Sequence, residues 1–77
     1  MPRLPVLSGK DLVTVLKKAG FSVVRQKGSH ISLQKHASEK VYRTVVPLHQ
    51  EIAKGTLLDI IHQTGLSKDG LLKLLKK

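Results

Sequence analysis

The chain has no cysteine, no tryptophan and only two aromatic residues, Phe21 and Tyr42. Without cysteine, a disulfide framework, a thiolate zinc site and thiol catalysis are all excluded. A platform that stacks single-stranded bases normally needs more aromatic side chains, which disfavours an RRM-like module. No apolar run approaches transmembrane length, and the first residues lack the apolar stretch of a signal peptide. We therefore expect a cytoplasmic protein that does not enter the membrane.

Acidic residues are also scarce. Five Asp and Glu stand against 14 Lys and Arg, which gives a formal net charge of +9 over 77 residues. The few acids are scattered, and no pair of histidines has the spacing of a local metal-binding motif, so we expect no metal and no small-molecule cofactor. The positive excess suits a polyanionic partner, most simply nucleic acid, because neutralising phosphates releases counterions. The length predicts one small domain over residues 1–77.

The first half of the chain predicts a helix followed by three strands. Ser8 has the character of a helix N-cap, apolar residues recur at helical spacing over 8–19, and Gly20 is a natural stop. The period then changes to that of β-strands. Three short β-prone runs follow, at residues 21–27, 30–34 and 41–46. Short links between them predict an antiparallel meander.

The second half predicts two helices after a linker at 48–54. Thr56 is the expected cap of the first helix, Gly65 its end, and Ser67 the cap of the second. The expected apolar faces are Leu57, Leu58, Ile60 and Ile61 in the first helix, and Leu71, Leu72, Leu74 and Leu75 in the second. The predicted fold is a two-layer α+β domain in which these helices and the first one cover one face of the sheet. The other face of the sheet stays open.

The turn between the first two strands is the most informative local feature. A Gly-Ser pair between two strand-like runs predicts a two-residue hairpin, with Gly28 at positive φ. In that register Lys27 lies opposite His30, and Arg25 lies opposite Ser32. Because side chains alternate between faces along a strand, Arg25, Lys27 and His30 are expected on one side. The core side of the hairpin is expected to carry Val24, Ile31 and Leu33.

These residue types suit metal-independent cleavage of RNA, in which the 2′-hydroxyl is the nucleophile. The reaction needs proton transfer and stabilisation of charge on the phosphate oxygens. His30 suits the first task, and Arg25 and Lys27 suit the second. The amides of the turn, around Gly28 and Ser29, are further candidates to bind a phosphate.

The other histidines are weaker candidates by position. His36 lies near a turn and is expected to be solvated, and His62 lies on a helix surface or at the edge of the core. His49 follows the third strand and reaches a site at the hairpin only if the linker folds back.

Two other functions remain open from the residues alone. In one, the protein is a non-catalytic RNA-binding module in which the charge matters and His30 is an ordinary surface residue. In the other, residues 56–77 form a helix-turn-helix that binds DNA, although the two helices are better explained as a cover for the sheet.

Six segments, in order along nearly the whole chain, carry a resemblance to a known family. They are Ser8-Gly9-Lys10-Asp11, Gly20-Phe21, Arg25-Gln26-Lys27-Gly28-Ser29-His30, Val45-Val46-Pro47-Leu48-His49, Glu51-Ile52-Ala53-Lys54-Gly55-Thr56-Leu57 and Gly65-Leu66-Ser67. The chain resembles the HicA-type toxins, small mRNA-cleaving proteins of toxin–antitoxin pairs. It departs from their pattern at Lys54, where such sequences often have proline.

The resemblance implies a fold like that of the double-stranded RNA-binding domain (dsRBD). It also implies endoribonuclease activity on mRNA that depends on His30 as the catalytic residue. The expected partners are RNA and a HicB-type antitoxin protein that neutralises the toxin by covering its site. Arg25, Lys27, Gly28 and Ser29 are the expected RNA-binding residues.

Overall fold

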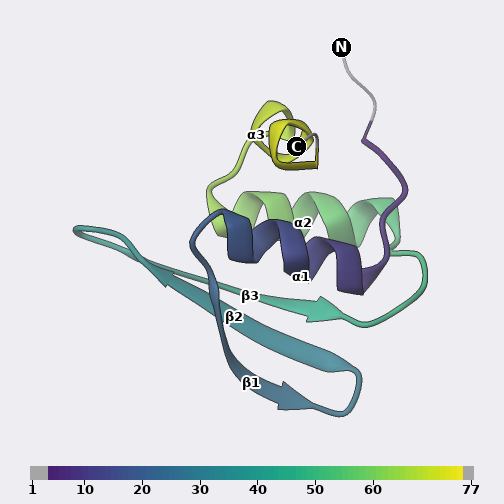
Figure 1. Cartoon of the computed structure of the whole chain (residues 1–77), viewed down its shortest axis with the longest axis horizontal. Coiled ribbons are helices and arrows are strands. Elements are labelled where there is room, and N and C mark those ends of the chain that lie inside the picture. Colours follow the sequence, from purple (N-terminus) through teal and green to yellow (C-terminus); the bar gives the residue numbers. More distant parts are fainter. Residues whose placement is uncertain (1–3, 76–77) are drawn as a thin grey trace.

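The elements follow one another in the predicted order, helix, three strands, helix and helix. The computed structural model describes residues 4–75. Its elements are α1 (Gly9–Lys18), β1 (Ser22–Lys27), β2 (His30–His36), β3 (Val41–Pro47), α2 (Lys54–Thr64) and α3 (Lys68–Leu75). The strands form one antiparallel sheet in the order β1-β2-β3 (Figure 1). This small α+β fold is consistent with a dsRBD-like domain, as predicted.

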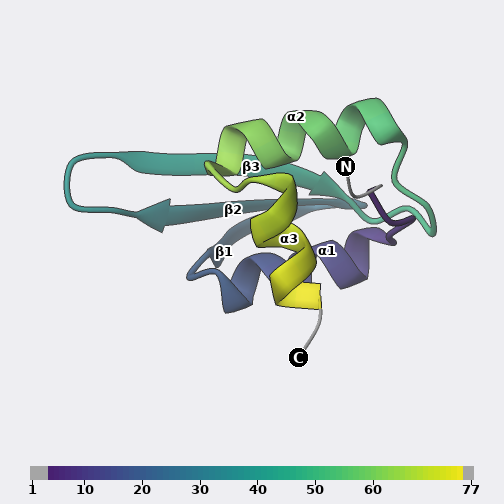
Figure 2. The same cartoon turned by 90° about the horizontal axis from the view of Figure 1, so that it is seen from above.

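The helices form two layers above the sheet. α1 and α2 lie on one face of the sheet, and α3 crosses over them on the side away from the strands (Figures 1 and 2). The expectation that α3 also covers the sheet is therefore wrong. The buried residues of the covered face are Leu33 of β2 and Thr44 and Val46 of β3, whereas all six residues of β1 are exposed. α1 and α2 therefore cover the sheet at β2 and β3. Leu71, which is fully buried, fixes α3 on this second layer.

One hydrophobic core joins the helices to the covered face of the sheet. Its buried residues are Leu7, Leu12, Val13, Val15, Leu16, Phe21, Leu33, Val46, Ile52, Leu57, Ile60, Ile61 and Leu71. Leu58, expected on the apolar face of its helix, is 36% exposed, so that expectation is wrong. Leu57 and Ile61 are four residues apart and point to the core, whereas Leu58, one residue after Leu57, is turned away from this buried face. Within residues 4–75, no helix has both the length and the apolar character needed to cross a membrane.

Capping at two of the helix starts is as predicted. The Ser8 Oγ accepts a hydrogen bond from the Asp11 amide at 3.0 Å, and the Ser67 Oγ accepts one from the Gly70 amide at 2.9 Å. Each bond satisfies an amide that has no partner within its helix. Gly65 ends α2 in the left-handed conformation, with φ of 72°.

The start of α2 differs from the prediction. The helix begins at Lys54, two residues before the expected cap Thr56, and Ala53 at the N-cap has no side-chain hydrogen bond. The Ile52 amide donates to the Leu7 carbonyl at 2.8 Å, and the Ile52 side chain is buried. The loop is thus anchored at Ile52, and the helix begins directly after that anchor.

Candidate functional site

The hairpin has the predicted register at its closed end. Gly28 takes a φ of 59° in the turn, where an added Cβ would meet no other atom. Lys27 pairs with His30, and Arg25 pairs with Ser32. All of these except the half-buried Ser32 are exposed. The two-residue turn therefore presents His30 directly beside a lysine on the neighbouring strand.

Strand alternation assigns these side chains to the uncovered face of the sheet. Leu33 is 1% exposed and faces the helices, and Ile31, two residues before it, is half-buried on the same face. His30 and its cross-strand neighbours occupy the alternate positions. We call Arg25, Lys27 and His30 the basic cluster, and the side of the sheet turned away from α1 and α2 the open face.

A β-bulge in β1 overturns one expectation about the core. Val23 pairs with Leu33 and Arg25 pairs with Ser32, which leaves Val24 without a partner. Val24 is 52% exposed, so its expected place in the core is wrong. The extra residue shifts the alternation at this point, which is the usual consequence of a bulge. The shift lies before Arg25 and leaves the register of the basic cluster intact.

The open face also gains a cation from the third strand that sequence reasoning missed. Arg43 of β3 pairs with Gln34 of β2 and is exposed. Arg43 and Arg25 line one pocket together with Ser32 and Gln34. The signal was present in the sequence, because alternation along the predicted third strand puts Arg43 out of phase with the buried Val46.

The linker after β3 does fold back on the hairpin. The Leu48 amide donates to the Ser29 carbonyl at 2.6 Å, and the Gly9 amide donates to the His49 carbonyl at 2.9 Å. A Cβ on Gly9 would overlap the Pro47 carbonyl oxygen and lie 2.8 Å from the Leu48 Cα. Gly9 thus permits close contact between the start of α1 and this loop. As a result His49 lies between the hairpin turn and the first turn of α1.

The remaining histidines lie away from the closed end of the hairpin. His36 is exposed at the other end of β2, with its Nε2 3.2 Å from the Gln34 Nε2. His62 is exposed on α2, within the range of positions expected for it. In the part of the chain that the structure describes, no three His, Asp or Glu residues form a group that could hold a metal ion.

Comparison with known protein families decides the class of this chain. The family model for the HicA toxin of bacterial toxin–antitoxin systems matches residues 9–66. The chain belongs to the HicA toxin family. The match begins at the first residue of α1 and continues past α2, so it includes the hairpin, the basic cluster and the loop that carries His49. No curated protein and no solved structure matches this HicA chain.

Proposed function

We propose that this HicA protein is an endoribonuclease that cleaves mRNA without a metal ion, with His30 as a catalytic residue. The observation that carries the proposal is the pairing of His30 with Lys27 at the exposed end of the hairpin. An imidazole that gives or accepts a proton is thereby adjacent to an ammonium group that attracts a phosphate. Membership of a toxin family supports the same interpretation.

The chemistry uses groups that these residues supply. The RNA 2′-oxygen attacks the phosphorus and loses its proton, while the bond from phosphorus to the 5′-oxygen breaks and that oxygen gains a proton. The products are a 2′,3′-cyclic phosphate and a 5′-hydroxyl. His30 performs one of the two proton transfers, and Lys27 and Arg25 stabilise the charge that develops on the phosphate oxygens. The turn amides at Gly28 and Ser29 are further donors to that phosphate.

The proposal is tested by comparing cleavage of single-stranded RNA by the parent protein, His30→Ala and His36→Ala in excess EDTA. Loss of general acid–base help typically lowers a rate by about 10²–10⁴-fold, and we expect that loss for His30→Ala. His36→Ala is the matched control, because it removes an exposed imidazole from the same strand. Its rate should equal that of the parent. Circular dichroism checks that both variants are folded.

Three results would contradict the proposal. A folded His30→Ala variant that cleaves at the parent rate would exclude His30 from catalysis. Activity that disappears in EDTA and returns with Mg²⁺ would exclude the metal-independent route. RNA binding by the parent without any cleavage would favour the non-catalytic RNA-binding module instead.

We also propose that a HicB-type antitoxin neutralises the protein by covering the basic cluster. A small basic nuclease with an exposed site is harmful to its own cell unless that site is masked. The exposed cations attract an acidic protein by the same electrostatics that attract RNA.

A further inference from the structure

A groove of about 590 Å³ lies between α1, the hairpin and the loop after β3. One wall is a stripe of α1 that includes Lys10, Thr14 and Lys17. The hairpin contributes Gln26, and the loop contributes His49. The groove therefore joins three segments that are distant in sequence, on the side of the hairpin opposite the basic cluster.

The charge of the groove points to a polyanion. Two lysines and a histidine line it, and among the described residues that line it there is no Asp or Glu. The pocket that contains Arg25 and Arg43 differs, because Asp59 contributes to its lining. Neither Phe21 nor Tyr42 lines the groove, so it offers no aromatic ring on which a base could stack. Its chemistry suits phosphates and sugars.

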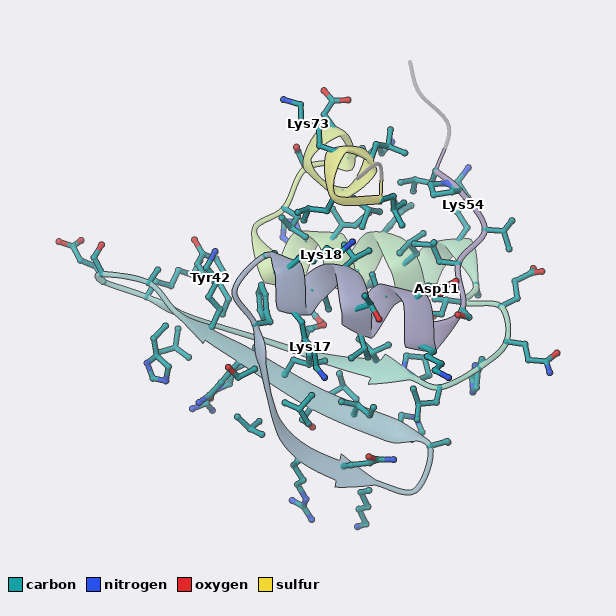
Figure 3. The ribbon with its side chains drawn as sticks, in the orientation of Figure 1. Asp11, Lys17, Lys18, Tyr42, Lys54 and Lys73 are labelled. Atoms are coloured by element: carbon teal, nitrogen blue, oxygen red, sulfur yellow. The ribbon has the colours of Figure 1, made fainter. Side chains whose placement is uncertain are left out.

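The spacing of the lysines suits more than one phosphate. Lys10 and Lys17 are seven residues apart, which is two helical turns and about 10 Å along the axis of α1. Both lie on the stripe that faces the groove. Figure 3 shows Lys17 on the sheet side of α1 and its neighbour Lys18 on the side toward α3. Only one of these adjacent lysines is thus available to a ligand in the groove.

The groove is continuous with the proposed cleavage site. Gln26 lines it, and the next residue, Lys27, belongs to the basic cluster on the other face of the strand. The hydrogen bonds from the loop to Ser29 and from Gly9 to His49 hold His49 where these two faces meet, at the closed end of the hairpin. An extended strand that passes over this end contacts both surfaces.

We propose that this groove binds the sugar–phosphate backbone of single-stranded RNA next to the cleaved bond. Lys10 and Lys17 each contact a phosphate, and the His49 imidazole donates a hydrogen bond to the backbone between the groove and the basic cluster. This subsite rests on the proposed function, because it holds a second part of the same RNA. It positions the substrate and takes no part in the reaction itself.

The test measures binding with a probe that the protein cannot cleave. A fluorescent 2′-O-methyl RNA oligonucleotide lacks the free 2′-hydroxyl, so its Kd is independent of catalysis. Lys10→Glu and Lys17→Glu should each weaken binding about tenfold, the loss of one charge-assisted contact. Each should also lower the log–log salt slope by about 0.7, the value for one phosphate on a single strand. His49→Ala should weaken binding by a smaller factor.

Lys18→Glu is the matched control. It makes the same charge change in the same last turn of α1, with the same effect on the helix dipole, but outside the groove. We expect its Kd to stay within about twofold of the parent value. With cleavable RNA, the groove variants should raise KM and leave kcat close to the parent value.

The outcomes separate the groove from the proposed function. If Lys17→Glu and Lys18→Glu weaken binding equally, the attraction is diffuse and the groove is not a subsite. If the groove variants slow association with the antitoxin but leave the Kd for RNA unchanged, the occupant is a protein and the inference is wrong. If the parent cleaves no RNA but the groove variants lose affinity as expected, the catalytic proposal fails and the subsite stands.

Discussion

At the scale of single residues, two glycines at the starts of helices differ in the space that their surroundings leave for a side chain. Gly9 is the first residue of α1, and its Cα faces the backbone of Pro47 and Leu48 with no space for a side chain. Gly55 is the second residue of α2, and an added Cβ there would meet nothing within 4 Å. We expect Gly9→Ala to lower the free energy of unfolding by about 1–3 kcal/mol, because the loop must move away from α1. Gly55→Ala should raise it by about 0.5 kcal/mol through the better helix propensity of alanine.

Urea denaturation of the two variants measures this contrast. Gly9→Ala should also increase the KM for RNA, because the displaced loop carries His49. Equal stability of the two variants would mean that the contact between α1 and the loop contributes little to the fold.

Several residues at this scale could be predicted from local chemistry, and others could not. The caps Ser8 and Ser67 are predictable, because a side-chain hydroxyl directly before an apolar helical stripe accepts a hydrogen bond from an amide of the first helical turn. The contact of Gly9 with Pro47 could not be predicted, because it depends on how a loop that is distant in sequence folds back on α1. The role of His30 is a prediction that only the cleavage experiment tests.

At the scale of elements, the hairpin illustrates how far sequence reasoning reaches. The turn fixes the register of the residues next to it, so the pairing of Lys27 with His30 followed from the Gly-Ser pair. The bulge at Val24 lies farther from the turn, and the pattern of apolar and polar residues along β1 does not indicate it. The edge strand β1 is exposed along its whole length. Because neither face of this strand is buried, its sequence does not need a regular alternation of apolar and polar residues.

The strand and the last helix should differ in their effect on RNA binding. Arg25→Ala and Lys27→Ala remove cations from the basic cluster, whereas Lys73→Ala removes an exposed cation from α3 (Figure 3). We expect each β1 variant to weaken RNA binding about tenfold and to lower the salt slope by about 0.7. Lys73→Ala should leave both values near those of the parent. Titrations at several salt concentrations measure this, and three equal losses would indicate attraction by net charge alone.

At the scale of the whole molecule, the layering explains which parts of the site were foreseeable. The α+β class and the open face of the sheet follow from element order and from apolar faces, both of which are local patterns, whereas the position of α3 over the other helices does not. The groove does not follow from local patterns, because it forms only where α1, the hairpin and the loop after β3 meet. Arg43 could be predicted only in part. Alternation along the third strand predicts the face on which it lies, but the sequence does not predict the register that pairs it with Gln34.

The net charge of +9 also predicts how the toxin is restrained. An acidic HicB-type antitoxin that covers the basic cluster should compete with RNA, so that increasing antitoxin displaces a labelled RNA and abolishes cleavage together. Charge reversal at Lys27 should slow association by about tenfold at low salt, because electrostatic steering is lost, and the difference should shrink as salt is raised. Stopped-flow measurements with Lys27→Glu, and with Lys73→Glu as the control on α3, distinguish steering at the hairpin from attraction by overall charge. A ternary complex in which RNA, toxin and antitoxin remain together with cleavage undiminished would contradict occlusion as the mode of inhibition.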